Sequence, residues 1–540
     1  MELQFATIWE SIADVVGDSP AVTHGDTTRT WSQYDDRAAR LAQAMVDAGL
    51  GTDSKVGLYL YNSNEYLEAH YAAFKFRGVP VNVNYRYLDE ELWYLLDNSD
   101  AEALFFHSSL GDRVARVVDR LPKLKLVVEV SDSPDHHVAK AAAYESVIAG
   151  HSPMKRITRS ADDTYMLYTG GTTGMPKGVM YKMGSMTQGF LGGLALVGLT
   201  PPSTIDGIPS MVADAHSSGV SIVSTPGCPL MHGTGIWIGA MMPQLGGAHV
   251  VTLTSRSFDA TELLETVEKR KISLTVVVGD SFVKPIIRAI DDAAAKGRTY
   301  DLSSLKLMMS SGVMWTAEVK EQLLDRVEHL VLLDAMGSTE GSMGTQITMK
   351  GVPPETAKFS QMPTTKVFTD DDREVVPGSG EVGKVAAGGN VPFGYYKDPE
   401  KSAKTFRVID GIAYSFPGDL AMVAEDGSLI LLGRGSQVIN SGGEKIFPEE
   451  VEEAVKRVPG VQDCLVVGVD DEKFGQAVTA VASIAPGQSV DEATVIAGVK
   501  TQLAGYKAPK RVVFVASVPR APNGKADYKT AKTLATEALG

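Results

Sequence analysis

A glycine- and threonine-rich segment carries the clearest chemical signal in the chain. Residues 168–180 read YTGGTTGMPKGVM and follow a strand-like run, TYMLY. The three glycines ahead of the lysine let the backbone turn tightly and bring its N–H groups close to an anion, while threonine hydroxyls add donors and one lysine adds a point charge. The order differs from the GxxxxGK[ST] loop of P-loop NTPases. The residues predicted to bind phosphate are Thr169, Gly170, Gly171, Thr172, Thr173, Gly174 and Lys177.

Four shorter motifs place polar residues beside glycines or at strand ends. Residues 336–341 read MGSTEG after an apolar run, and a strand that delivers small residues and then an acid suits a nucleotide site. The others read SSGVM at 310–314, YSFPGDLA at 414–421 and VPRAPNGKADY at 518–528. A lone Asp or Lys in such motifs is ordinarily a solvated surface charge, so each gains meaning only within a common framework.

The thirteen-residue segment resembles the signature loop of the adenylate-forming superfamily, which contains acyl-CoA synthetases, adenylation domains of peptide synthetases and firefly luciferases. The later motifs follow in the order and spacing of that family, so the resemblance covers nearly the whole chain. It implies an ATP-dependent acyl-CoA ligase that forms an acyl-adenylate and pyrophosphate and then transfers the acyl group to coenzyme A, releasing AMP. VVVGD, DAMGSTEG and YSFPGDLA look similar to bacterial synthetases acting on fatty or steroid side-chain carboxylates.

The resemblance also implies roles for single residues. Lys525 bridges the carboxylate and the α-phosphate, Asp419 binds the ribose, and Arg434 contacts ribose or phosphate. The expected catalytic residues are Lys525, Glu340, Thr339, Lys177 and His232, and the expected Mg²⁺ ligands are Glu340 and Thr172. The residues expected to contact ATP or the thiol are the loop residues 169–174 and Lys177, with Gly312, Asp334, Ala335, Met336, Gly337, Ser338, Thr339, Asp419, Arg434, Gly442, Gly443, Lys445 and Lys525.

Three residues depart from the usual family pattern. Met336 stands where most members have an aromatic residue that stacks on adenine, and Pro417 stands where Thr is usual before Gly-Asp. Ser436 occupies the hinge position, where Asp or Lys is more common.

Alternating helices and strands must position these motifs. Strands are predicted at 55–61, 79–83, 103–107 and 124–130, and again at 249–253, 274–278, 305–309 and 330–333, with helices between them. Short strands and turn pairs follow from 366 to 432. We therefore expect an α/β fold: an N-terminal adenylating domain, residues 1–434, with two βα sheets and a small β-barrel, and a smaller, mobile α+β domain, residues 435–540.

Composition limits the remaining choices. The chain has 540 residues and a formal net charge of −15, and such an acidic chain is not typical of nucleic-acid-binding proteins. Two cysteines suggest neither a disulfide framework nor a thiolate metal site. No signal peptide or apolar span is evident, so a cytoplasmic location is expected. The expected partners are a small carboxylic acid, ATP and coenzyme A, and a homodimer is left open.

Two other functions are alternatives to the ligase hypothesis. One is a stand-alone adenylation enzyme that loads a carrier protein, and the other is a catalytically silent ligand-binding protein on the same fold. An amino-acid substrate is disfavoured because no Asp lies in the HGTG loop at 232–235 to hold an α-amino group. Segments 189–199, 232–242, 278–282 and 336–343 are apolar and rich in Gly and Met, which predicts a roomy hydrophobic acyl pocket.

Overall fold

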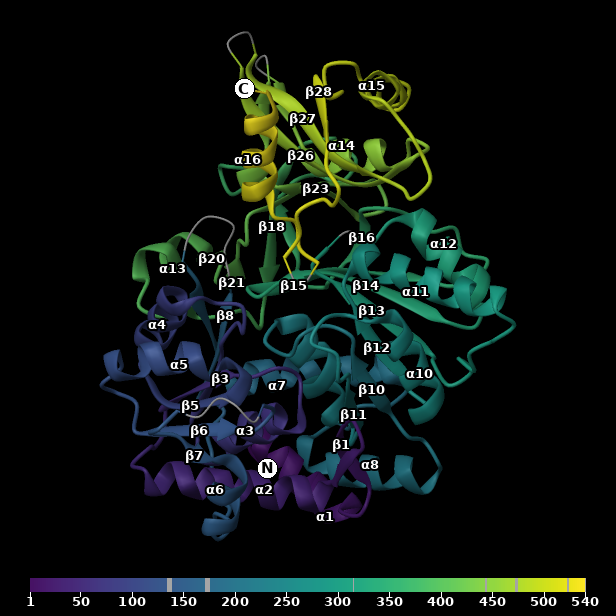
Figure 1. Ribbon diagram of the computed structural model, residues 1–540. Coiled ribbons are helices and arrows are strands. Elements are labelled where there is room, and N and C mark those ends of the chain that lie inside the picture. The colour runs from purple at the N-terminus through teal and green to yellow at the C-terminus, as the bar shows by residue number, and fades with distance from the viewer. Residues whose placement is uncertain are drawn as a thin grey trace.

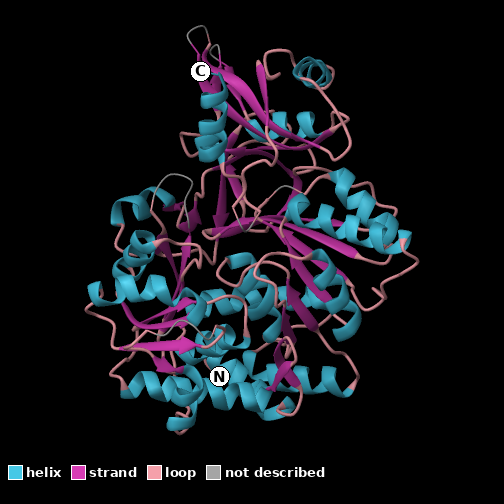
Figure 2. Cartoon of the chain, in the orientation of Figure 1, coloured by secondary structure: helices cyan, strands magenta, loops and turns pink. Residues whose placement is uncertain are grey.

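The chain forms three lobes in a computed structural model that describes residues 1–133, 138–169, 175–313, 315–441, 444–471, 474–521 and 524–539. Figure 1 shows two lower lobes, one purple to blue and the other teal, with a yellow-green C-terminal lobe above them. Helices cover both lower sheets, which confirms the predicted α/β class (Figure 2). None of the helices in the described ranges is long and apolar enough to cross a membrane.

The first lower lobe is built on a five-stranded parallel sheet in the order β4-β3-β5-β6-β7. Its strands are β3 (Lys55–Tyr59), β4 (Val79–Asn82), β5 (Ala101–His107), β6 (Leu126–Val130) and β7 (Ala142–Ala143). Its helices are α2 (Trp31–Asp47), α3 (Asn64–Lys75), α4 (Asp89–Asn98), α5 (Gly111–Val117) and α6 (Tyr144–Gly150). The start of α2 is fixed by a capping box, in which Thr30 and Gln33 satisfy each other's backbone N–H groups.

The second lower lobe holds parallel strands in the order β1-β11-β10-β12-β13-β14. They are β1 (Pro20–His24), β10 (Val223–Pro226), β11 (His249–Thr252), β12 (Leu274–Val277), β13 (Leu307–Ser311) and β14 (Val331–Ser338). Helices α10 (Ala260–Arg270), α11 (Gly279–Ala295) and α12 (Ala317–Arg326) connect them. All four strands predicted here are present, whereas β1 and β10 were not predicted because they join the sheet from distant parts of the chain.

The sheet becomes antiparallel where β14 turns into β15 (Gly341–Thr348). Pairing then continues through β16 (Lys358–Gln361), β23 (Leu429–Arg434), β22 (Asp419–Val423), β18 (Gly383–Gly388), β21 (Ile412–Ser415) and β20 (Phe406–Ile409), with β17 (Lys366–Phe368) on β18. These short strands agree with the turn-rich texture of residues 366–432. The antiparallel part is therefore joined by hydrogen bonds to the second parallel sheet.

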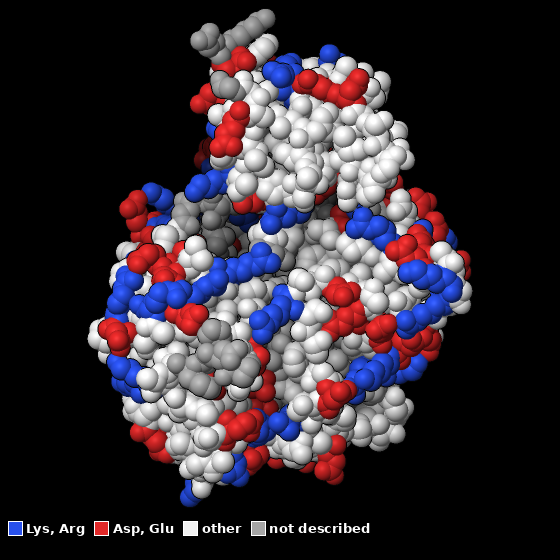
Figure 3. All heavy atoms as spheres, in the orientation of Figure 1, with Lys and Arg blue, Asp and Glu red and all other residues white. Residues whose placement is uncertain are grey.

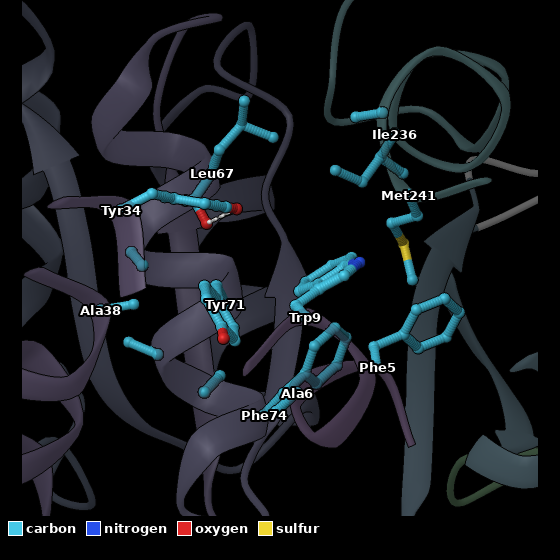
Figure 4. Close-up of a cluster of buried hydrophobic side chains, with 14 of the residues drawn as sticks. Phe5, Ala6, Trp9, Tyr34, Ala38, Leu67, Tyr71, Phe74, Ile236 and Met241 are labelled. Atoms are coloured by element: carbon cyan, nitrogen blue, oxygen red, sulfur yellow. Dashed lines mark hydrogen bonds between the residues drawn. The ribbon is translucent and has the colours of Figure 1, made fainter. Parts of the chain in front are cut away.

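An aromatic core joins the first helices to the segment that lines the central cavity (Figure 4). Phe5 and Trp9 of α1 (Phe5–Val16) pack against Phe74, and Trp9 meets Tyr71 edge to face at 5.1 Å between ring centroids. Ile236 belongs to the same buried cluster and lies on a π-helical segment, η5 (Thr234–Met241). Removing such an aromatic side chain costs about 3–5 kcal/mol of stability, so packing in this core contributes to stabilising the contact between η5 and the first helices.

The C-terminal lobe has its own sheet, in the order β25-β24-β27-β26 with β28 beside β27. The elements are β24 (Ile439–Ser441), β25 (Glu444–Ile446), α14 (Pro448–Lys456), β26 (Val461–Asp471), β27 (Gly475–Ile484), α15 (Glu492–Lys500), β28 (Arg511–Phe514) and α16 (Tyr528–Leu539). Its mixture of helices and strands agrees with the α+β class predicted for this part of the chain. The boundary between Arg434 and Gly435, and the mobility of this lobe, stay predictions.

Candidate active site

The two ends of the predicted phosphate loop lie on paired strands. Strand β8 (Thr164–Thr169) pairs antiparallel with β9 (Lys177–Lys182), so that Thr169 is opposite Lys177. Gly170, Gly171, Thr172, Thr173 and Gly174 lie outside the described residues. The Lys177 ammonium forms an ion pair with Asp398, 2.9 Å from its Oδ2 atom.

The turn from β14 to β15 presents small residues to a large cavity. Side chains alternate along β14, so Leu333, Ala335 and Gly337 line the cavity together with Ser338 and Thr339. Asp334 and Met336 point to the other side and are not among the lining residues. Asp334 accepts a hydrogen bond of 3.0 Å from Lys320, whereas Met336 packs in the core of the antiparallel strands.

Glu340 sits at that turn and is held by an aromatic neighbour. The Tyr395 hydroxyl, on β19 (Gly394–Tyr395), donates to Glu340 Oε1 at 2.8 Å. The Tyr181 hydroxyl donates to the Thr339 carbonyl at 3.0 Å and so fixes the backbone beside it. The sequence motif had identified Glu340 and Thr339 but not these two tyrosines.

Asp419 and Arg434 are opposite each other on adjacent antiparallel strands, with Arg434 Nε 3.5 Å from Asp419 Oδ1. Burial raises the pKa of the Asp419 carboxyl, and the Arg434 guanidinium partly offsets this. The Oδ2 atom of Asp419 is buried and has no hydrogen-bond partner among the described residues. A buried acceptor of this kind is costly unless a ligand satisfies it, which suits a hydroxyl-bearing ligand.

Lys525 enters the cavity from the C-terminal lobe. A tight turn carries it, in which the Ala521 N–H donates to the Lys525 carbonyl at 2.8 Å and Gly524 lies against Ser281 of α11. Its side chain lines the cavity, and the residue is exposed to solvent there. Burial and then Arg434 lower the pKa of this ammonium, while Glu340 and Asp419 oppose the shift. Four predicted site residues therefore converge from both parts of the chain.

His232 is a neutral imidazole in this site. Burial, and the cations Lys525 and Arg86, lower its pKa to about 3. Its Nε2 atom is buried without a hydrogen-bond partner among the described residues, and the residue lines the cavity. His232 can therefore offer a hydrogen bond to a carboxylate or carbonyl, but it carries no charge near neutral pH.

Gly312 brings the backbone of β13 close to the lysine. Its φ is +88°, and a Cβ atom there would lie 3.3 Å from Lys525 Cε. Asp280, whose orientation the sequence left open, accepts hydrogen bonds from the Thr316 N–H and hydroxyl and so supports the start of α12. Gly442, Gly443 and the side chain of Lys445 lie outside the described residues, so their predicted contacts with the thiol stay predictions.

The cavity that these residues share has a volume of about 1510 Å³. Its apolar end is formed by α7 (Met183–Gly192), the following turn η3 (Gly193–Val197) and η5. Gly189 and Gly192 face open space, since a Cβ atom at either would meet nothing within 4 Å. Its other wall includes residues of α16, namely Tyr528, Lys529, Lys532, Thr533 and Thr536.

The two parts of the chain also meet at Glu449 of α14. A Cβ atom at Gly433, whose φ is +108°, would overlap the Glu449 carboxyl, and the Arg434 N–H donates to Glu449 Oε1 at 3.4 Å. Burial, then Glu452, and to a smaller extent Asp419 raise the pKa of Glu449 to about 8. Docking in this position therefore favours the protonated form of the carboxyl.

Glu449→Gln should flatten the alkaline limb of the pH profile of acyl-adenylate formation. Because docking raises the pKa of Glu449, its contribution to docking is complete below the ordinary value of 4.5 and is lost as pH rises through about 8. Gln keeps the shape and the acceptor without ionising. Acid-dependent ATP–pyrophosphate exchange, measured from neutral to alkaline pH, should decline less in the variant. Superimposable profiles would contradict a role for this carboxyl in docking.

Comparison with known proteins identifies the family. Residues 9–396 match the model of the AMP-binding enzyme family, and residues 450–525 match the AMP-binding enzyme C-terminal domain. A medium/long-chain-fatty-acid–CoA/3-oxocholest-4-en-26-oate–CoA ligase of Mycobacterium tuberculosis is 40% identical over 98% of this chain and 96% of its own length. A 3-oxocholest-4-en-26-oate–CoA ligase of Rhodococcus rhodochrous is 39% identical with the same coverage.

Solved structures support the same fold. ATP-bound MatB from Rhodopseudomonas palustris superposes with a TM-score of 0.83 at 24% identity and covers 100% of both chains. The anthranilate CoA ligase AuaEII in complex with anthranoyl-AMP gives 0.84 at 21% identity, covering 99% of this chain and 98% of its own. The expected two-part adenylate-forming architecture is thereby confirmed. The chain belongs to the AMP-binding enzyme family, as an AMP-forming acyl-CoA synthetase that uses ATP and coenzyme A.

Proposed function

We propose that the enzyme activates a bulky hydrophobic carboxylic acid, either a medium- to long-chain fatty acid or a steroid side-chain acid. The curated relatives named above act on such acids. The cavity supports the proposal because its apolar end is wide and lined by glycines, methionines and aromatic side chains rather than by charges. Its volume of about 1510 Å³ leaves room for a nucleotide and a large acyl group together.

The first half-reaction brings two anions together, so cations and fixed donors must supply the catalysis. We propose that Lys525 lies between the carboxylate and the α-phosphate and that Lys177 binds the phosphate chain. Asp419 would accept hydrogen bonds from the ribose hydroxyls through its unsatisfied Oδ2 atom. Lys and Arg side chains lie along the groove below the C-terminal lobe (Figure 3), which favours an anionic nucleotide.

We propose Glu340 as the protein ligand of Mg²⁺, with Thr172 as a second one. Among the described residues there is no cluster of three or more His, Cys, Asp or Glu side chains able to hold a metal. One carboxylate fits Mg²⁺ nevertheless, because this ion keeps waters and substrate phosphates as its other ligands. Bound there, Mg²⁺ would offset the negative charge of the phosphates.

The second half-reaction needs Lys525 out of the cavity and a thiol in its place. We propose that the lobe formed by residues 435–540 rotates about Ser436. A recess of about 540 Å³ could hold the anionic end of coenzyme A, since Arg86, Arg113, Arg116 and Arg256 line it. A smaller pocket shares Arg86 with this recess and Cys228 with the main cavity. A homodimer and a cytoplasmic location stay predictions of the sequence.

The Gly192→Leu enzyme should lose activity with wide acids and keep its activity with narrow ones. The new side chain would project into the open end of the cavity, where a Cβ atom meets nothing within 4 Å. We expect kcat/KM for a steroid side-chain acid to fall roughly 10–100-fold, with a short linear acid little affected. Gly150→Leu at the end of α6 is the matched control, since that glycine is equally open but outside the cavity. Equal losses for both acids would argue against this acyl site.

A panel of carboxylic acids tests the proposed function directly. Pyrophosphate release is followed with fatty acids, steroid side-chain acids, aromatic acids and amino acids, each with and without coenzyme A. We expect CoA-dependent AMP release with the bulky hydrophobic acids. Acylation of a carrier protein without turnover of coenzyme A would instead favour the carrier-loading enzyme, and no release with any acid would favour a silent binding protein.

A further inference from the structure

Two lysines from different segments converge on one aromatic ring beside the predicted phosphate loop. Lys177 begins β9, and Lys401 lies on the short helix α13 (Pro399–Thr405). Their ammonium nitrogens are 5.7 Å and 5.6 Å from the centroid of the Tyr395 ring. The sequence predicts phosphate binding for Lys177 but assigns no role to Lys401.

Within the described parts of the chain, one carboxylate, that of Asp398, forms an ion pair with this pair of cations. Asp398 forms its ion pair with Lys177, at 2.9 Å, and receives only the backbone N–H of Lys401, at 3.1 Å. Burial, and after it the adjacent Lys177, lower the pKa of the Lys401 ammonium, while Glu340 and Asp398 oppose this. Two like charges held this close repel each other, and a polyanion bound between them would remove that cost.

Strand pairing and a hydrogen bond connect the surroundings of the two lysines to the active site. Strand β19 pairs with β9, with Tyr395 opposite Val179. The Tyr395 hydroxyl in turn donates to Glu340. Both lysines therefore lie beside the tyrosine that contacts the proposed metal ligand.

We propose that Lys401, with Lys177, binds the β- and γ-phosphates of ATP and then the departing pyrophosphate. This inference rests on the proposed function. As a carboxylate oxygen of the acid bonds to the α-phosphorus, the bond between that phosphorus and the oxygen bridging the α- and β-phosphates breaks. The electron pair of that bond leaves with pyrophosphate. Two ammonium groups near that leaving group stabilise its extra charge without accepting or donating a proton.

The test is direct binding of inorganic pyrophosphate to the full-length protein, by calorimetry with Mg²⁺ present and no acid or coenzyme A. Lys401→Met should raise the Kd for pyrophosphate about tenfold, the effect of one lost ionic hydrogen bond. Lys401→Arg should stay within about threefold of the natural protein because the charge is kept. Lys404→Met on the same helix is the control, since Lys404 is exposed and paired with Glu400 at 2.6 Å.

The Kd for AMP separates binding from a merely structural role. AMP lacks the β- and γ-phosphates, so it should bind Lys401→Met as tightly as the natural protein. An unchanged Kd for pyrophosphate, or equal weakening of pyrophosphate and AMP, would overturn the inference. If the Met variant unfolds, Lys401→Gln, which is polar but uncharged and one atom shorter, is judged by the same two constants. No acid enters these measurements, so a failed acid panel would sink the proposed function and leave this result standing.

Discussion

Lys525→Ala should slow acyl-adenylate formation by roughly 10²–10³-fold and leave the thioester half-reaction largely intact. The ammonium lies in the cavity near Glu340 and Asp419, where the carboxylate and the α-phosphate would meet. Removing one group that stabilises developing negative charge costs roughly 10²–10³-fold in rate. The proposed second half-reaction places Lys525 outside the cavity, so it should not need this side chain.

Two assays separate the half-reactions of the Lys525→Ala enzyme. Acid-dependent ATP–pyrophosphate exchange reports the first, and CoA thioester formed from supplied acyl-adenylate reports the second. Lys500→Ala is a suitable control, because Lys500 is an exposed lysine at the end of α15 on the same lobe. Similar losses in both assays would contradict the assignment of Lys525 to adenylation alone.

Glu340→Gln should reduce adenylate formation by roughly two orders of magnitude or more, because the proposed metal ligand would lose its negative charge. Gln can still accept the hydrogen bond from Tyr395, which is 2.8 Å long, so the turn should keep its shape. The dependence of pyrophosphate exchange on Mg²⁺ concentration is the informative measurement, and half-saturation should move to higher Mg²⁺.

Tyr395→Phe is the natural companion to Glu340→Gln. It removes the hydroxyl that orients Glu340 and keeps the carboxylate, so we expect a smaller loss, about tenfold. A Glu340→Gln enzyme with unchanged Mg²⁺ dependence would exclude Glu340 as the metal ligand, even if its rate were lower.

Local patterns were enough to predict much of this molecule. The strands from β3 to β6 and from β11 to β14 are marked by apolar runs between glycines and polar turns, and each forms close to its predicted place. The opposition of Thr169 to Lys177 follows from a loop between two strands that pair with each other. These features depend on neighbours in sequence.

Contacts between distant segments could not be predicted in the same way. Tyr395 lies far from Glu340 in the chain, and only the pairing of β19 with β9 brings its hydroxyl there. Near Tyr395, the Asp-Pro pair at 398–399 is a local sequence signal for the start of the helix α13.

Met336 was expected to contact the nucleotide. The alternation of side chains along its strand instead buries it in the core of the antiparallel strands, and its role in binding stays a prediction. The partner of Asp334, Lys320, is likewise a tertiary contact.

The α16 wall of the cavity has a consequence for the order of events. The lobe that carries Lys525 also closes one side of the cavity with residues such as Tyr528 and Thr533. If that lobe rotates as proposed, the lysine and the wall depart together. The cavity is then open to solvent only while Lys525 is outside it. Lys525 is inside the cavity only while α16 closes that side. Entry of the acid and its activation become mutually exclusive states, which would protect the reactive anhydride from water until a thiol can reach it.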